Sequence, residues 1–167
     1  KWGKVTGAAK YRVFRKTGSG SWSKMCDTSS LTYTDRSVKN GTGYSYTVRC
    51  ISSDGRSYTS ALNSVGKKTT YIAVTQISRV ANNATKTATV KWSQNKAATG
   101  YQIQYSTSSN YSSKKTVGIS KGSITSKSIG SLAKGKTYYF RIRVYKKVGG
   151  NNVYSAWSTT KKVKINK

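Results

Sequence analysis

Apolar and polar residues alternate strictly in several segments of the chain. Residues 44–50 place tyrosines, a valine and a cysteine on one side of an extended strand, with Ser45, Thr47 and Arg49 on the other side. Residues 138–144 repeat this alternation. A period of two with aromatic and β-branched residues is typical of half-buried antiparallel strands. Glycine- and asparagine-rich turns separate such segments, so the pattern predicts an all-β protein of short strands.

Three blocks of similar sequence occur in the same order in both halves of the chain. Residues 2–11 match 92–101 at an offset of 90, residues 41–50 match 135–144 at an offset of 94, and residues 58–61 match 154–157. A duplicated order with small changes in loop length indicates a tandem repeat. We therefore expect two domains, at residues 1–72 and 73–167.

Each repeat has a hydrophobic residue six positions before the first tyrosine of a strand. These pairs are Val38 with Tyr44 and Leu132 with Tyr138. The spacing resembles the tyrosine corner of fibronectin type III domains. The resemblance implies two tandem fibronectin type III-like, immunoglobulin-like β-sandwiches.

Two further features support this resemblance. Trp2 and Trp92 stand where such domains have a tryptophan at the end of their second strand. The segment 98–105 is similar to repeats in surface and secreted proteins of Gram-positive anaerobic bacteria. The resemblance therefore implies a bacterial protein that is exported to the cell surface or secreted.

The two repeats differ at their beginnings. About 16 residues precede Trp92 in the second repeat, enough for strands near 76–80 and 88–92, whereas one residue precedes Trp2. The first sandwich is therefore expected to lack its N-terminal strand or strands, with an open edge and an uncovered core. We also expect upstream domains of a longer chain.

The chain is extremely basic. It has 31 Lys and Arg against 3 acidic residues, no histidine and a net charge of +28; the second repeat has 18 of the basic residues and none of the acidic ones. Such a surface attracts polyanions. The expected partners are anionic glycans or cell-wall polymers, with only non-specific binding of nucleic acid because the lysines form no single stripe.

The residues that most enzymes use are missing. Without His or Glu, the acid–base candidates are Asp27, Asp35 and Asp54, each of which lies in an expected turn or loop. We expect no enzyme activity, no cofactor and no metal. Cys26 and Cys50 match no metal motif and are either free thiols or a disulfide. No apolar stretch is long enough for a transmembrane segment.

The candidate ligand-binding residues lie on the expected solvent side of the strands. In the second repeat, Tyr139, Arg141 and Arg143 alternate with core residues, and Trp157 is expected on the neighbouring strand. Their counterparts in the first repeat are Arg12, Phe14 and Arg49, with Phe14 the clearest exposed apolar residue.

The segment around Trp157 resembles half of the Trp-Ser-x-Trp-Ser motif of cytokine-receptor repeats, in which arginines stack on tryptophan. This resemblance implies an intramolecular cation–π ladder that rigidifies the sheet. The alternative is a basic-aromatic platform for an anionic glycan or nucleic acid.

Two functions remain open at this point. One is a non-catalytic adhesion and spacer module whose basic surface binds anionic polymers. The other is specific recognition of a host protein, such as a receptor or immunoglobulin, through a sheet face or edge.

Overall fold

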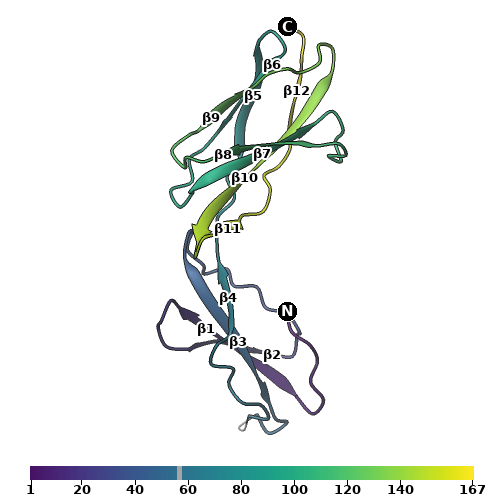
Figure 1. The fold of residues 1–167 in the computed structure, drawn as a ribbon. Helices are drawn as coiled ribbons and strands as arrows, with labels where there is room; N and C mark the ends of the chain where they lie inside the picture. The colour runs from purple at the N-terminus through teal and green to yellow at the C-terminus, as the bar shows by residue number, and fades with distance from the viewer. Residues whose placement is uncertain (56–57) are drawn as a thin grey trace. The chain divides into compact units, whose positions relative to one another are not determined.

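The computed structural model describes residues 1–55 and 58–167, and every regular element in these ranges is a β-strand (Figure 1). The all-β fold expected from the alternating pattern is confirmed. The chain divides into two compact units, Lys1–Tyr71 and Ile72–Lys167. No helix capable of crossing a membrane occurs in the described ranges.

In the described residues, the first unit forms one antiparallel sheet with the strand order β2-β1-β3-β4. These strands are β1 (Lys10–Thr17), β2 (Ser23–Thr28), β3 (Gly43–Ile51) and β4 (Lys67–Thr70). The central pair β1–β3 is in register from Lys10 opposite Ile51 to Thr17 opposite Tyr44. This register places the apolar positions of both strands on the same face.

That apolar face forms the core of the first unit. Tyr11, Val13, Tyr44 and Cys50 are 2% to 6% exposed. The segment before β1 covers part of it, because the Trp2 ring packs on Tyr11 with their centroids 5.7 Å apart. The expectation of an uncovered core is therefore wrong in part. This segment and the β2–β3 connection cover Tyr11 and Tyr44, whereas Val48 on the same face is only half-buried.

The opposite face of β3 also differs from the expectation. Ser45 and Thr47, expected to face solvent, are 5% and 6% exposed. Residues that follow β3 contribute contacts on this face, where the Lys16 ammonium donates to the carbonyl of Ser64 and lies 4.8 Å from the centroid of the Trp22 ring. Small hydroxyl side chains fit a strand that is covered on both faces.

The second unit contains two sheets in the described residues. One has the order β11-β10-β7-β8 with β12 also paired to β10, and the other has the order β5-β6-β9 (Figure 1). The first sheet comprises β7 (Gly100–Ser106), β8 (Lys115–Ile119), β10 (Thr137–Val148), β11 (Asn151–Tyr154) and β12 (Lys161–Lys164). The second comprises β5 (Ile77–Ala84), β6 (Thr87–Trp92) and β9 (Ser126–Ile129).

Both sheets of the second unit contribute to one core, which makes the unit a β-sandwich. Val90 of β6 and Ile103, Phe140 and Ile142 of the facing sheet are fully buried in one cluster. Strands β5 and β6 occupy the segments predicted near 76–80 and 88–92. They have no equivalent in the described first unit, which is consistent with its expected lack of N-terminal strands.

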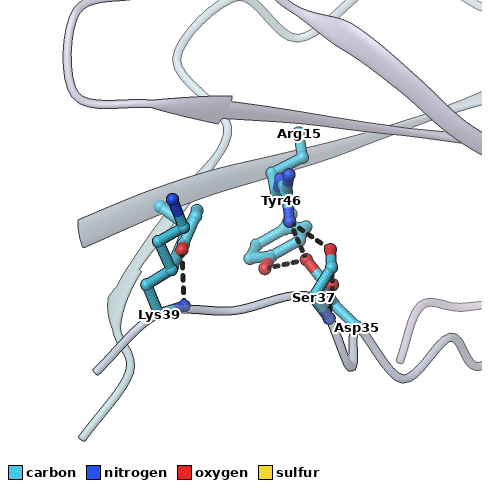
Figure 2. Close-up of polar contacts among 6 residues, drawn as sticks. Arg15, Asp35, Ser37, Lys39 and Tyr46 are labelled. Carbon is cyan, nitrogen blue, oxygen red and sulfur yellow. Dashed lines mark hydrogen bonds and ion pairs between the residues drawn. The ribbon is translucent and has the colours of Figure 1, made fainter. Parts of the chain in front are cut away.

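Each unit has a tyrosine corner. The hydroxyl of Tyr44 accepts a hydrogen bond of 2.8 Å from the backbone N–H of Lys39, and Figure 2 shows the dashed line that ends at Lys39. The hydroxyl of Tyr138 accepts one of 3.0 Å from the N–H of Ala133. The turn before each tyrosine contains a glycine with positive φ, 76° at Gly41 and 82° at Gly135. Glycine adopts this backbone region without steric cost.

The two cysteines carry free thiols in the structure. Cys26 on β2 lies opposite Val13, and Cys50 on β3 lies opposite Tyr11, so strand β1 separates them. Because neighbouring strands are about 4.8 Å apart, cysteines on strands two apart exceed the Cα separation of about 7 Å that a disulfide tolerates. The register therefore does not support the disulfide considered from the sequence.

Candidate functional site

Arginine and aromatic side chains alternate on one face of the second unit. Arg141 and Arg143 project from the same side of β10 because they are two residues apart. The Arg141 guanidinium carbon lies 4.0 Å from the centroid of the Tyr111 ring and 4.6 Å from that of Trp157. The Arg143 carbon lies 4.5 Å from the centroid of Trp157 and 3.8 Å from that of Tyr154. These five residues form what we call the cation–π ladder.

Glutamines on the neighbouring strand hold the two guanidinium groups. Gln104 lies opposite Arg141 and Gln102 lies opposite Arg143 in the β7–β10 register. Arg141 donates to Gln104 Oε1 from Nε at 3.1 Å and from Nη2 at 2.7 Å. Arg143 donates to Gln102 Oε1 from Nε at 2.8 Å. Both arginines are therefore fixed by neutral acceptors.

Two serines anchor the segment that carries Trp157. The Ser155 hydroxyl accepts from the N–H of Val144, and the Ser158 hydroxyl accepts from the N–H of Ile142, each at 3.0 Å. Both serines are less than 10% exposed. This backbone attachment replaces regular strand pairing beside the middle of β10 and holds the Trp157 ring between the two arginines.

The cation–π ladder has positive charges but no carboxylate side chain of its own unit to balance them. Residues 72–167 contain no Asp or Glu, so no carboxylate side chain of the second unit can neutralise Arg141 or Arg143. Burial lowers the pKa of Arg143 from its ordinary value, with the charge of Arg141 adding a smaller effect in the same direction. A partly desolvated cation without an internal counter-charge favours an incoming anion.

The stacking also determines how a ligand can approach. Trp157 contacts both guanidinium groups, and Tyr111 is only 6% exposed. Base-stacking sites need an accessible aromatic face, and the arginines occupy the faces of Trp157. The ladder therefore offers the edges of guanidinium groups to a ligand rather than a stacking platform.

The remaining predicted residues lie in different surroundings. Tyr139 is half-buried opposite Lys162 of β12 and has no ring contact with the ladder among the described interactions. Arg12 and Arg49 both contact the Tyr58 ring, at 5.5 and 3.4 Å from its centroid. Phe14 is half-buried rather than exposed, which corrects the expectation of an exposed apolar contact. The reason is that this face of the first sheet is partly covered.

Sequence reasoning missed two members of the ladder, Tyr154 and Tyr111, and the two glutamines that hold its arginines. Tyr154 could have been found, because residues 154–158 match Trp-Ser-x-Trp-Ser at four of five positions with tyrosine replacing the first tryptophan. Gln102 and Gln104 flank Ile103 on the outward side of their strand and were detectable by alternation. Tyr111 gave no signal, since it lies in a loop and is brought to Arg141 by the tertiary fold.

In the first unit, carboxylates neutralise the two arginines of β1, Arg12 and Arg15. Arg12 donates to Asp27 from Nε at 2.6 Å and from Nη2 at 2.8 Å, and Lys24 donates to the same carboxylate. The side-chain hydrogen bond from Arg12 holds the pKa of Asp27 well below its usual range. Among the described residues, all three ion pairs belong to this unit.

Asp35 is the centre of a second polar cluster in the first unit. Figure 2 shows Arg15, Tyr46 and Ser37 around its carboxylate; Arg15 Nη1 and the Tyr46 hydroxyl donate to Oδ2 at 2.8 and 2.7 Å. Burial by itself raises the pKa of Asp35, but the hydrogen bonds from Tyr46, Ser37 and Arg15 outweigh it and lower the pKa to about 2. The cluster fastens the β2–β3 connection to the sheet, which is a structural role.

Comparison with known proteins identifies the family of the chain. Residues 73–161 match the fibronectin type III domain family. The chain belongs to this family. No curated protein matches it.

Two solved structures with fibronectin type III domains are similar to the chain. A two-domain segment from chicken tenascin has 21% identity and a TM-score of 0.48, with 96% of this chain and 87% of that chain covered. The chicken CNTN1 FN1–FN3 domains have 19% identity and a TM-score of 0.47, with 95% and 54% covered. The chain thus spans about half the length of the CNTN1 fragment.

Proposed function

We propose that the chain is a non-catalytic binding and spacer module of a cell-surface or secreted bacterial protein, and that it binds anionic polymers such as an acidic glycan or a cell-wall polymer. Fibronectin type III domains commonly serve as binding or spacer modules in cell-surface proteins and are typically non-catalytic. The observation that carries the proposal is the pair Arg141 and Arg143, fixed by neutral glutamines in a unit without a carboxylate side chain.

Several physical properties favour such a role. Arginine presents a planar fork of donors that matches carboxylate, sulfate and phosphate, whereas lysine presents a point charge. The ladder holds both guanidinium groups in place before binding, so less side-chain entropy is lost when a ligand binds. At physiological salt the Debye length is about 8 Å, so charges near the contact matter more than distant ones.

A second candidate function is recognition of a host protein through the β10–β11 hairpin. Tyr154 on this hairpin is 37% exposed, and its ring packs against that of Tyr145 with centroids 5.9 Å apart, which gives a small aromatic surface at the charged ladder. Exposed aromatic residues next to arginine are common at the energetic centres of protein interfaces. A protein interface of this kind would depend less on salt than the binding of a polyanion.

The test compares two double variants of the full chain with equal loss of charge. Arg141→Gln/Arg143→Gln removes the ladder cations, and Lys67→Gln/Lys68→Gln removes two exposed cations of β4 in the first unit. We expect the arginine variant to weaken binding to heparin, a sulfated glycan probe, by at least about tenfold more than the lysine variant, a difference of about 1.4 kcal/mol.

Isothermal titration calorimetry at two salt concentrations measures both effects. Circular dichroism melting curves show whether each variant remains folded. Equal losses in the two variants would leave only diffuse charge attraction. Unchanged affinity in both, or binding that is insensitive to salt, would contradict the proposed polyanion function and favour the protein partner.

A further inference from the structure

The two units share one element of the candidate site, an arginine stacked on a tyrosine. Arg143 lies 3.8 Å from the centroid of Tyr154, and Arg49 lies 3.4 Å from the centroid of Tyr58. The offset of 94 that relates residues 41–50 to 135–144 makes Arg49 the equivalent of Arg143, and Tyr58 and Tyr154 both begin the third repeated block. We call these the Arg–Tyr pairs.

In both pairs the described acceptors of the arginine are neutral and bind Nε. Arg143 Nε donates to Gln102 Oε1 at 2.8 Å, and Arg49 Nε donates to the backbone carbonyl of Ser60 at 3.1 Å. An Nε–H bond fixes the plane of a guanidinium group and leaves its two terminal nitrogens as a fork of donors. The same orientation therefore arises in the two units from different acceptors.

The other arginines of these faces are already engaged more fully. Arg12 binds both oxygens of Asp27, at 2.6 and 2.8 Å. Arg141 donates to Gln104 from Nε and Nη2 and packs on Tyr111, which is only 6% exposed. Tyr154, in contrast, is 37% exposed beside Arg143. Among the described arginines that stack on these two faces, the Arg–Tyr pairs are thus the ones whose guanidinium fork remains available to a ligand.

We propose that each Arg–Tyr pair binds one sulfate or carboxylate group of an acidic glycan, so that the chain carries two equivalent anion subsites, one in each unit. This inference rests on the proposed function, which it narrows to one acidic group per unit. The terminal guanidinium nitrogens donate to two oxygens of the acidic group. The Tyr154 hydroxyl is a further donor beside Arg143, whereas the Tyr58 hydroxyl beside Arg49 also accepts from Arg12 Nη1 at 2.9 Å.

Two subsites on one chain predict a dependence on ligand length. A polymer that occupies one subsite reaches the second at a raised effective concentration, whereas a short oligosaccharide occupies one subsite at a time. Loss of one Arg–Tyr pair should therefore weaken binding of a long heparin chain more than binding of a heparin disaccharide.

The experiment uses the full chain and single substitutions that remove one charge each. Arg49→Gln and Arg143→Gln remove the pairs, and Lys68→Gln on β4 and Lys127→Gln on β9 are matched controls in the first and second unit, because both lysines are exposed. Affinity is measured for long heparin, for a heparin disaccharide, for desulfated heparin and for inorganic polyphosphate. Arg143→Lys keeps the charge but removes the fork.

We expect each arginine substitution to lower the affinity for long heparin about tenfold, the combined substitution to lower it by more than either alone, and each lysine control to change it less than about twofold. Arg143→Lys should lose most of what Arg143→Gln loses. Desulfated heparin binds through its carboxylates, and the variants should rank in the same order by loss of affinity for it. If polyphosphate bound more tightly than heparin and the variants ranked in the same order, phosphate would be the group recognised, and the glycan subsite would be overturned.

Losses that are equal for arginine and lysine variants would overturn the Arg–Tyr subsites while leaving polyanion binding intact. If Arg143→Gln lowered the affinity and Arg49→Gln did not, the proposal of one subsite in each unit would be overturned. Should Arg143→Gln unfold the second unit, Arg143→Lys and Tyr154→Phe serve in its place, since the first keeps the cation and the second keeps the stacked ring.

Discussion

The two units differ at equivalent residues of the repeat, which are apolar in the second unit and charged in the first. In the second unit Tyr105 of β7 stacks on Phe140 of β10, with centroids 5.7 Å apart and an angle of 15° between the rings, and Ile129 is buried. At the offsets of the repeat, Tyr105 corresponds to Arg15 and Ile129 to Asp35. Two residues of the apolar core in the second unit therefore correspond to a hydrogen-bonded ion pair in the first unit.

This difference follows the location of the few carboxylates, all of which belong to the first unit. Asp27 and Asp35 of the first unit each bind an arginine of β1, and these contacts fasten the sheet to its covering segments. The second unit has a complete sandwich and builds its core from apolar residues of two sheets. Its arginines are left to neutral partners on the surface, where their charge is available to a ligand.

The largest expected effect comes from breaking the ion pair of the first unit. Asp35→Ala leaves Arg15 without its counter-charge, and the Arg15 side chain is only 23% exposed. We expect the free energy of unfolding of this unit to fall by about 3 kcal/mol. Urea unfolding followed by residue-resolved NMR separates the two units.

The double variant Arg15→Tyr/Asp35→Ile sharpens this comparison, because it installs the apolar residues of the second unit. Replacing a buried pair by apolar residues of suitable size is often neutral, so we expect its stability to lie within about 1 kcal/mol of the native chain. A double variant as unstable as Asp35→Ala would show that the first unit cannot pack an apolar contact at this position.

Acid should destabilise the first unit and spare the second. The pKa of Asp35 is about 2 in the folded chain, against about 3.9 for an unfolded aspartate. Because the folded pKa is the lower one, the stabilisation is complete above about pH 4 and is lost as the pH falls through 2, which amounts to about 2 kcal/mol.

Asp27 titrates in the same direction, whereas the second unit has no carboxylate side chain. Unfolding curves at pH 6 and pH 2.5, resolved by unit, provide the measurement. A parallel loss of stability in both units would contradict the assignment of this acid sensitivity to the two aspartates.

The smallest expected effect concerns the cation–π ladder. Trp157→Leu removes the ring that contacts both Arg141 and Arg143. With about 0.5–1 kcal/mol for each contact, the second unit should lose about 1–2 kcal/mol of stability. Trp22→Leu is the control in the first unit, since one cation, Lys16, stacks on that ring, and a smaller loss is expected. Thermal melting of both variants tests whether the ladder stabilises the sheet as well as presenting charge.

The sequence by itself determined the strands, the repeat and both tyrosine corners. These features depend on local signals, such as the period of two, the six-residue spacing before Tyr44 and Tyr138, and glycine in the turn. Alternation along β10 also placed Arg141 and Arg143 on one face, because side chains of a strand point to alternate sides whatever the rest of the fold does.

Only the tertiary structure decided which groups meet those side chains. Strand register put Gln102 and Gln104 opposite the two arginines and kept Cys26 and Cys50 on either side of β1. Loop paths brought Tyr111 to Arg141 and Asp35 to Arg15. They also buried Ser45 and Thr47 and half-buried Phe14 on a face expected to be exposed. Contacts between residues far apart in sequence depend on how loops close and sheets pair, and alternation along a single strand does not encode that information.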